Sequence, residues 1–291
     1  MKILVTGGGG LIGSHSSELL VKRGHNVLVL DNFSTGRREH LAAFRGKVLQ
    51  GDITDLACLE AALHDFKPEA VLHLAAQSAI SISMKDPKKD LEINAGGTLN
   101  LLQMAKKYGV RRFVFASTSA VLDIPPTPYG ISKNAAENYI RSMFPNYMIL
   151  RYANVYGPRQ IPLGENQVIA RAFNHLIHGT EFKVTGHGCQ KRDFVYVEDV
   201  AYCNFLALMC DTLGIFNVGT GESAMVNQVI AMISDIAGLP YEHVWEHTIH
   251  NDPRGDVHLD VQPIRRATGW SASVPLRDGL RRTLEWWMGQ K

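Results

Sequence analysis

Short apolar runs alternate with amphipathic stretches through the first half of the chain. Six runs predict buried strands, at Ile3–Thr6, Val27–Asp31, Val48–Gly51, Ala70–Leu74, Phe113–Ser117 and Met148–Arg151. Between the first two, Leu11–Arg23 mixes apolar and charged residues in a way that suits a helix. Strands that alternate with helices predict a parallel sheet covered on both faces, a doubly wound α/β fold of the Rossmann type.

The pattern becomes less regular beyond residue 151, where Gly and Pro are more frequent. We therefore predict a first domain over residues 1–151 and a smaller α/β lobe formed mainly by residues 152–291. A length of 291 residues allows one large domain or two modest ones. The apolar positions of Leu276–Met288 predict a helix that packs on the smaller lobe, with a partner surface as the alternative.

Glycines occupy the turn between the first strand and the first helix in a Gly-x-x-Gly-x-x-Gly pattern. In a dinucleotide fingerprint, Gly7 permits the tight turn, Gly10 lets the backbone approach a pyrophosphate, and Gly13 lets the helix pack closely. The helix N-terminus at Leu11 and Ile12 offers N–H groups to phosphates. No Lys-Ser or Lys-Thr follows, which argues against a P-loop. A tight turn in another α/β protein is the alternative.

An acid at the end of the second strand indicates which dinucleotide is bound. Asp31 stands about 20 residues beyond the glycines, where a carboxylate can accept a hydrogen bond from an adenosine ribose hydroxyl. The same carboxylate repels a 2′-phosphate, so the pattern favours NAD. Arg37 and Arg38 follow closely and could hold that phosphate, which leaves NADP as the alternative.

A tyrosine and a lysine four residues apart suggest proton transfer beside this cofactor. Tyr129 and Lys133 would share one helical face. We expect the lysine ammonium, helped by the positive nicotinamide ring, to lower the pKa of the tyrosine hydroxyl, so that it can take a proton from a sugar or alcohol. An exposed helix start is the alternative for this pair taken alone.

Charge and composition limit the classes of partner. The net charge is +2 and the basic residues are scattered, so no nucleic-acid footprint is present. No apolar run is long enough for a membrane span. The first strand begins at Lys2 and leaves no room for a signal peptide, which favours a cytoplasmic protein. The four cysteines lack CxxC spacing and are expected to be reduced.

Three histidines near the C-terminus are spaced like metal ligands on a helix. His243, His247 and His250, however, lie in a segment with strand-like alternation between Pro240 and Pro253. We therefore expect no metal site.

Several motifs in a fixed order carry a resemblance to a known family. Besides the glycines and Tyr129-x-x-x-Lys133, they are Asp31–Gly36, Gly51–Ile53, His73–Gln77, Asn94, Ser117–Ser119, Leu150–Arg159 and Arg192–Val197. With these motifs the chain resembles the extended short-chain dehydrogenase/reductases, especially the nucleotide-sugar epimerase/dehydratase branch, over nearly its whole length. The resemblance implies a strand and a helix that return from about residues 182–210 to the first domain. It also implies a homodimer formed through helices near Leu91–Lys107 and Ala135–Met143.

The resemblance extends the set of residues expected to contact NAD. Beyond the glycine turn, Leu11, Ile12, Tyr129 and Lys133, the set comprises Asp31, Asn32, Ser34, Thr35, Asp52, Ile53, Leu74, Ala75, Ala76, Asn94, Tyr152 and Val155. Asp52 has an alternative as a helix N-cap, a role that Thr54 and Asp55 also fit.

The resemblance implies a nucleotide-sugar substrate, with a UDP-linked sugar as the expected kind, and a set of residues that hold it. Thr118 stands where relatives place the hydroxyl that bonds the reacting sugar, and Gln77, Asn154, Val168, Arg192 and Arg254 complete the expected set, with Asn154, Arg192 and Arg254 as the candidates for the diphosphate. Arginine suits a diphosphate because its planar fork binds oxygens in pairs. For Arg192 the alternative is a salt bridge with Asp193 or Glu198. Arg254 is displaced by one position from the Arg-x-Gly-Asp of relatives.

The residues after Thr118 bear on the reaction. Dehydratases of the family carry Asp-Glu there and decarboxylases carry a Glu, whereas this chain has Ser119-Ala120. This favours a 4-epimerase of a UDP-hexose or UDP-N-acetylhexosamine that oxidises C4 transiently and retains NAD. The alternatives are a dehydratase, decarboxylase or ketoreductase, or a catalytically silent NAD-binding protein.

The connection from Thr118 to Tyr129 is short and holds three prolines, Pro125, Pro126 and Pro128. In most relatives this connection is much longer. The hypothesis is that the sugar pocket is more open on this side, which would change specificity or reaction.

Overall fold

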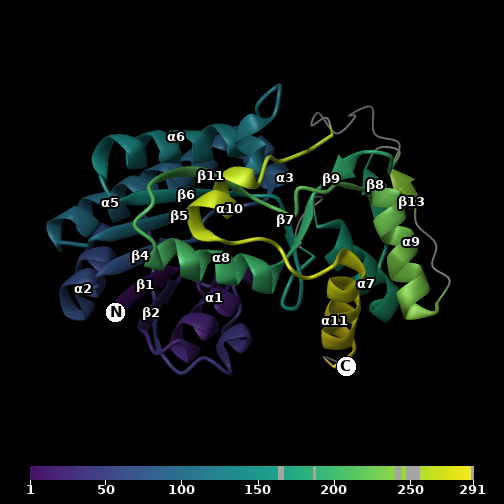
Figure 1. The fold of residues 1–291 in the computed structure, drawn as a ribbon, viewed down its shortest axis with the longest axis horizontal. Coiled ribbons are helices and arrows are strands. Elements are labelled where there is room, and N and C mark those ends of the chain that lie inside the picture. The colour runs from purple at the N-terminus through teal and green to yellow at the C-terminus, as the bar shows by residue number, and fades with distance from the viewer. Residues whose placement is uncertain (163–166, 186–187, 240–243, 247–255, 290–291) are drawn as a thin grey trace.

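The computed structural model of the chain describes residues 1–162, 167–185, 188–239, 244–246 and 256–289. A seven-stranded sheet in the order β11-β6-β5-β4-β1-β2-β3 forms its centre (Figure 1), and all six strand pairs are parallel. The strands are β1 (Lys2–Thr6), β2 (Asn26–Asp31), β3 (Lys47–Gln50), β4 (Ala70–His73), β5 (Arg112–Thr118), β6 (Tyr147–Tyr152) and β11 (Gly214–Val218). The six predicted strands and the Rossmann-like α/β fold are confirmed.

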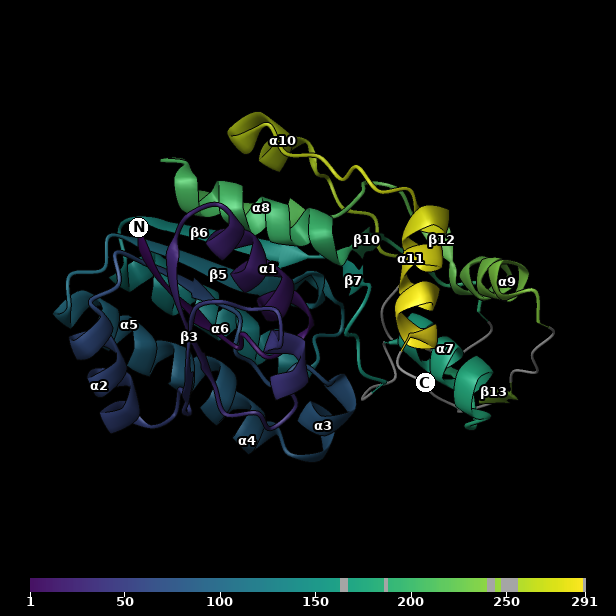
Figure 2. The ribbon, with the colours of Figure 1, turned by 90° about the horizontal axis from the view of Figure 1, so that it is seen from below.

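Helices cover both faces of this sheet (Figure 2). The helical segments of this part are α1 (Leu11–Lys22), η1 (Arg38–Leu41), α2 (Leu56–Phe66), α3 (Ile80–Lys85), α4 (Pro87–Leu91), η2 (Glu92–Gly96), α5 (Gly97–Lys107), η3 (Ser119–Leu122), α6 (Pro128–Met143) and α8 (Val197–Met209). Side chains alternate along a strand, so Ile3 and Val5 pack in one apolar cluster with Leu20 of α1, while Leu4 packs in another with Leu101 of α5. Each face of the sheet therefore has its own core.

The sequence places the helix starts that matter for the site. Asp55 caps α2 by accepting hydrogen bonds from two backbone N–H groups. Thr127 caps α6 in the same way through the N–H of Gly130, and Pro128 fits the first turn, where its missing N–H is not needed. Helix α6 therefore begins directly before Tyr129.

The chain returns to the sheet after first leaving it. Helix α8 packs against α1 and lies within the range expected for a returning helix. The returning strand is β11, however, and not a segment before α8 as expected. Strand β10 (Phe194–Tyr196) pairs instead with β7 (Asn154–Tyr156). A strand that joins the sheet in parallel must follow its crossover helix, so it comes after α8.

A third apolar cluster forms the core of the smaller lobe. Its helices are α7 (Val168–His178), α9 (Val226–Ala237) and α11 (Leu276–Met288), so the predicted C-terminal helix is confirmed. Short pairs β12 (Ala224–Met225) with β9 (Lys191–Arg192) and β13 (Val244–Glu246) with β8 (Lys183–Thr185) complete the lobe. Helix α10 (Gln262–Thr268) lies back over β11, and Trp270 inserts in the core beneath α8.

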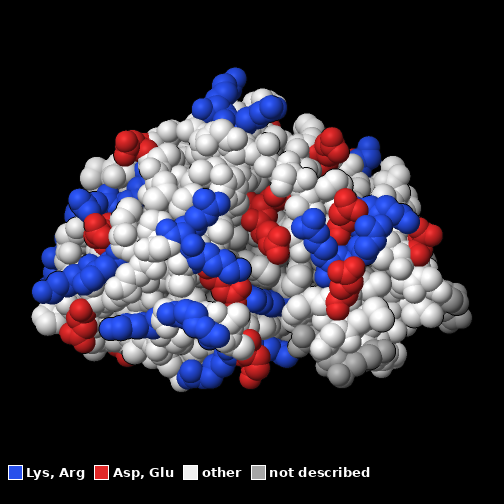
Figure 3. All heavy atoms as spheres, turned by 60° about the horizontal axis from the view of Figure 1, so that its bottom comes forward, with Lys and Arg blue, Asp and Glu red and all other residues white. Residues whose placement is uncertain are grey.

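The surface is mixed in charge. On the face shown in Figure 3, basic and acidic side chains are interspersed. Exposed pairs such as Arg281 with Asp278, 3.0 Å apart, contribute to this mixture. Among the described residues, no helix is both long enough and apolar enough to cross a membrane.

Candidate active site

The glycine turn between β1 and α1 is shaped by close backbone contacts. Gly7 has a φ of +71°, and a Cβ there would lie 2.6 Å from the backbone nitrogen of Ala75. A Cβ on Gly13 would lie only 2.1 Å from the carbonyl oxygen of Gly7. Gly10 precedes α1 in an extended conformation and supplies no side-chain cap. The first N–H groups of α1, at Leu11 and Ile12, therefore face the turn without a side-chain partner from its N-cap.

Asp31 at the end of β2 holds the loops around this turn. Its carboxylate accepts hydrogen bonds from the backbone N–H groups of Gly9 at 2.8 Å and Phe33 at 2.7 Å. The residue is only 7% exposed, and each carboxylate oxygen keeps a further lone pair for a ribose hydroxyl. Asp31 therefore shapes the glycine turn as well as being placed for the ribose.

Asn32 and Asp52 lie together beside Asp31. The Asn32 amide donates to Asp52 at 2.7 Å, and Asp52 also accepts from the backbone and hydroxyl of Thr54. Partial burial would raise the pKa of Asp52, but these hydrogen bonds outweigh it and lower that pKa. The N-cap of α2 is Asp55, so the N-cap alternative for Asp52 is wrong. Ser34 and Thr35 are exposed in the neighbouring loop.

The segment after β4 passes directly beneath the glycine turn. The backbone N–H groups of Leu74 and Ala75 both donate to the hydroxyl of Thr6 at 3.2 Å. Ala76 follows in the same segment and is partly exposed. Ile53 is 4% exposed and packs in the core, so its backbone is the part of it that can face a ligand.

Three predicted catalytic residues meet where β5 ends and α6 begins. Thr118 is the last residue of β5, and its side-chain oxygen accepts from the N–H of Ala120 at 3.1 Å. Tyr129 and Lys133 both lie on α6, as predicted. A hydrogen bond joins the hydroxyls of Thr118 and Tyr129, and the Lys133 amine lies 4.0 Å from the centre of the Phe115 ring.

The lowering of the Tyr129 pKa that was expected from the lysine and the nicotinamide ring together is not produced by the protein groups alone. Burial raises the pKa of Tyr129 to about 12, and the hydrogen bond with Thr118 only partly opposes it. Burial also lowers the pKa of Lys133 to about 7, although the nearby carboxylates of Glu137 and Asp90 act in the opposite direction. The four-residue spacing predicts that Tyr129 and Lys133 share one helical face. It does not predict that burial removes water from around the hydroxyl and the amine and so shifts both pKa values. A bound positive charge would be needed to bring the tyrosine toward neutral pH.

We predict a pH-dependent stability difference that reports on the buried lysine. Between about 7 and 10.5, the unfolded chain holds a proton on Lys133 that the folded chain has released. The unfolded state then binds more protons, so the stability of the folded state rises with pH. The free energy of unfolding of the wild type relative to Lys133→Met should therefore increase from pH 7 to pH 10 in urea titrations. For the control, Lys106→Met at an exposed position, the free energy of unfolding should change with pH as it does for the wild type. If the free energy of unfolding of Lys133→Met also changed with pH as it does for the wild type, the prediction would be contradicted.

A buried polar network below Tyr129 contains two predicted residues and two that the sequence analysis missed. Asn94 accepts from the backbone of Gln77 at 2.9 Å and donates to Asp90 and Ser132, both at 3.1 Å. Gln77 also donates to Asp90 at 2.7 Å. Asn94 lies in the π-helical turn η2, a distortion that is frequent at functional sites. Gln77 and Asn94 thus bond to one another, to Asp90, to Ser132 and to the backbone of Ala79.

Glu137 is a further buried residue that the sequence analysis missed. It lies one turn beyond Lys133 on α6, is 1% exposed, and accepts two hydrogen bonds from the Arg151 guanidinium at 2.8 and 2.5 Å. Ser117 donates to the same carboxylate at 2.5 Å. The four-residue spacing from Lys133 is the signal that could have identified it.

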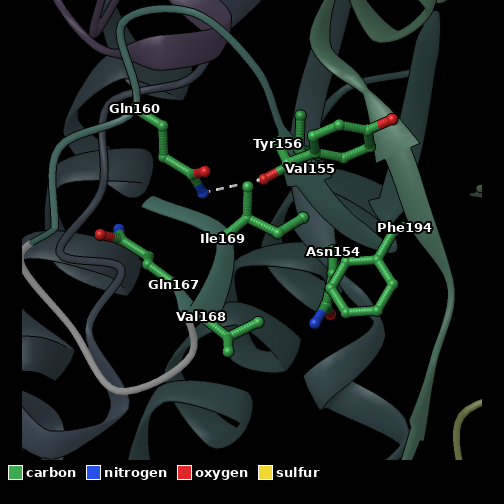
Figure 4. Close-up of a pocket in the computed structure, with 8 residues that line it drawn as sticks. All are labelled: Asn154, Val155, Tyr156, Gln160, Gln167, Val168, Ile169 and Phe194. Carbon is green, nitrogen blue, oxygen red and sulfur yellow. Dashed lines mark hydrogen bonds between the residues drawn. The ribbon is translucent and has the colours of Figure 1, made fainter. Parts of the chain in front are cut away.

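Asn154, Val155 and Val168, three of the predicted contact residues, line one pocket (Figure 4). Tyr156, Gln160, Gln167, Ile169 and Phe194 complete its lining.

Other predicted residues lie around or outside this pocket. Tyr152 is buried, and its hydroxyl donates to Asn204 at 2.5 Å, so its backbone is the part that could contact a cofactor. Arg192 is 2% exposed and donates to the carbonyl oxygen of Lys191 at 2.7 Å, and the Asp193 carboxylate accepts from Thr220 and Gly221. The predictions for Arg254, His243, His247 and His250 concern positions outside the described residues.

These features fit a dinucleotide along the carboxyl ends of the strands. The glycine turn is a backbone cradle that a single Cβ would fill, and the start of α1 offers N–H groups to a pyrophosphate. Strand β1 lies between β4 and β2 in the sheet, so the turn is beside the point where strand order reverses. Gly7, Gly13 and Asp31 would hold NAD there, and Tyr129 lies at the same edge of the sheet, beside the end of β5.

Comparisons with known proteins agree with this geometry. The family described as the NAD dependent epimerase/dehydratase family matches residues 3–219. The UDP-glucose 4-epimerase of Mycolicibacterium smegmatis is 35% identical, over 98% of this chain and 98% of its own. The solved structure of the Thermotoga maritima UDP-glucose 4-epimerase with UDP-glucose is 37% identical with a TM-score of 0.93, and covers 100% of this chain and 99% of that one.

A second solved structure contains the cofactor that the glycine turn and Asp31 predict. The Thermus thermophilus UDP-glucose 4-epimerase in complex with NAD is 35% identical with a TM-score of 0.92, and the match covers 100% of both chains. Fold, cofactor cradle and sequence similarity therefore agree over the whole length of the protein. The chain belongs to the NAD-dependent epimerase/dehydratase family.

Proposed function

We propose that the protein is a 4-epimerase of a UDP-hexose or UDP-N-acetylhexosamine. The observation that carries the proposal is the arrangement of Thr118, Tyr129 and Lys133 at the carboxyl edge of the sheet, with Ser119 and Ala120 in place of an acid. NAD, when bound, accepts hydride from the sugar and returns it, so the reaction has no net redox change. The similarity to UDP-glucose 4-epimerases supports this choice of substrate.

Tyr129 is the group that moves the proton. Its hydroxyl takes the proton of the sugar 4-hydroxyl as that carbon is oxidised, and gives it back after the sugar has turned. Thr118 bonds to the Tyr129 hydroxyl and is placed to bond the same sugar oxygen. A hydrogen bond donated by Thr118 stabilises the charged tyrosinate and so favours the proton transfer.

Lys133 supplies charge to the site from a buried position. The residue is 2% exposed, and its amine has a pKa of about 7. Near neutral pH it can therefore gain or lose a proton at little cost. In the protonated form it stabilises the Tyr129 oxyanion, and the carboxylates of Asp90 and Glu137 favour that form. The polar networks around Asn94 and Glu137 hold the helix that carries both residues.

Dehydration is the second reaction named in the description of the family. Water elimination needs an acid and a base placed at the reacting sugar, and η3 presents Ser119 and Ala120 directly after Thr118. Ala120 is 4% exposed and packs against the start of α6 rather than facing solvent. This local structure favours the epimerase.

The short link between Thr118 and Tyr129 supports a pocket that is open on one side. After η3, the link is exposed, and Ile124 in it is 88% exposed. We expect the short, exposed link to leave room for a bulky substituent such as an N-acetyl group.

A panel of UDP-sugars tests the proposal. We expect an isobaric product inverted at C4, seen by mass spectrometry and NMR, from UDP-glucose and from UDP-N-acetylglucosamine, with no net formation of NADH. A product lighter by one water would make the protein a dehydratase. Strict specificity for UDP-glucose would contradict the open pocket, and no turnover of any UDP-sugar would contradict the epimerase.

A further inference from the structure

Gln160 in the pocket of Figure 4 is buried and has an oriented carboxamide. The residue is 7% exposed, and its Nε2 atom donates to the carbonyl oxygen of Val155 at 3.2 Å. This bond fixes which end of the amide carries the nitrogen. The opposite atom, Oε1, has less than 1 Å² exposed and has no hydrogen-bond partner among the described residues. A buried acceptor of this kind is costly unless a ligand or a water satisfies it.

The turn that carries Gln160 is held rigidly against the cofactor-binding helix. Arg159 has a φ of +71°, a conformation that costs energy for a residue with a side chain. Its guanidinium donates to Glu18 of α1 at 2.8 Å, and the neighbouring carbonyl of Pro158 bonds to His15 of α1 at 3.1 Å. Burial lowers the pKa of His15 to about 4, so this ring is neutral and donates through Nε2 at neutral pH. Two contacts to α1 thus maintain a strained turn that aims Gln160 into the pocket.

The position of the pocket indicates which part of a nucleotide sugar would reach it. Thr118 on β5 lies opposite Tyr152 on β6, and Asn154 in the pocket comes two residues later. Asn154 and Val168 of this pocket are among the residues predicted to hold the nucleotide sugar, so we assign the pocket to the part of the substrate that includes the hexose. A hexose carries several hydroxyl groups, each of which can donate to an acceptor such as Oε1 of Gln160.

We propose that Gln160 accepts a hydrogen bond from a hydroxyl of the hexose and so positions the sugar beside Thr118. This inference rests on the proposed function, because it assumes that a nucleotide sugar occupies the site. The donated bond to Val155 keeps the acceptor pointed at the sugar. Gln160 is thus a specificity residue of the pocket and takes no part in the proton transfer itself.

Calorimetric binding to the NAD-loaded protein separates this role from a structural one. Gln160→Met keeps the length of the side chain and removes its amide. We expect the Kd for UDP-glucose to rise about tenfold, the loss expected for one hydrogen bond to a buried polar group, while the Kd for UDP is unchanged. The control is Gln228→Met, the same change at an exposed position on α9. An equal loss of affinity for UDP, or a loss of bound NAD in the released-nucleotide assay, would overturn the proposal.

Substrate analogues identify the hydroxyl concerned. A fluorine in place of a hydroxyl cannot donate, so UDP-glucose analogues fluorinated at C2, C3 or C6 remove one donor at a time. One analogue should bind the wild type about tenfold more weakly than UDP-glucose and bind Gln160→Met as well as UDP-glucose does. If each analogue is discriminated equally by both proteins, a buried water satisfies Oε1 and the proposal fails. Both experiments measure binding and not turnover. A failure of this proposal can therefore be told apart from a failure of the proposed function, which would be seen as an absence of epimerisation by the wild type.

Discussion

Replacing Tyr129 by phenylalanine should lower kcat for epimerisation by about 100- to 10,000-fold, the range that a positioned general acid or base contributes. The substitution removes one buried hydroxyl, which bonds to Thr118, and leaves the ring on α6 in place. Because the loss falls on the proton transfer, the KM for the UDP-sugar should change little. Progress curves at saturating UDP-sugar, read by NMR, measure the effect.

The matched control for this variant lies on the same helix. Tyr139→Phe makes the same chemical change at a side chain that is 43% exposed, and it should keep the wild-type kcat. The amount of NAD released on denaturation should be equal in the wild type and both variants. A Tyr129→Phe protein that retains NAD and more than about a tenth of the wild-type kcat would show that another group moves the proton, since less than tenfold is below the usual contribution.

Gly13→Ala should abolish stable NAD binding and lower the stability of the whole protein. Its Cβ would lie 2.1 Å from the carbonyl oxygen of Gly7 and 2.7 Å from the Cα of Gly8, so backbone atoms must move. We expect a loss of about 3 kcal/mol in the free energy of unfolding, the upper part of the range for overpacking. Displacing α1 also moves the N–H groups that would face the pyrophosphate. Urea titration and the content of bound NAD measure the two effects.

Gly96→Ala serves as the control because a Cβ there has no neighbour closer than 4.0 Å and the backbone is already helical. It should keep both NAD and stability, since alanine is the better helix former. A Gly13→Ala protein with full NAD content and wild-type stability would mean that the turn can open at no cost, and would contradict the close contact that the structure shows.

The parts of the fold that follow from local pattern were predictable. Apolar runs such as Val27–Asp31 end within one residue of the strands they form, because a strand buried on both faces needs a continuous run. The glycine turn and the pair of Tyr129 and Lys133 could equally be predicted from the sequence, since each depends on short-range spacing. The place of β11 was not predictable in this way, because the residues Gly214–Val218 become a sheet strand only after α8 has brought them back beside β6.

The missed site residues depend on packing between distant parts of the chain. Ser132 bonds to Asp90, which is 42 residues away, and Gln160 is aimed by contacts with α1 that span more than a hundred residues. Spacing along the chain cannot indicate such partners. The pKa of Tyr129 is a similar case, because it depends on how much water the finished fold leaves around the hydroxyl.

The repeated crossing of the chain between the two lobes has a consequence for motion. In chain order, α7 lies in the smaller lobe, α8 and β11 lie in the sheet domain, α9 lies in the smaller lobe, α10 lies beside β11, and α11 returns to the smaller lobe. Two bodies joined by so many segments cannot swing apart about a single hinge, since each connection would have to bend at once. A keto sugar formed between them in the proposed reaction would therefore be confined, free to rotate in place but slow to escape. In the proposed reaction, confinement of this kind would let each hydride return to the sugar before the sugar escapes, so that the cofactor would be restored in every turnover.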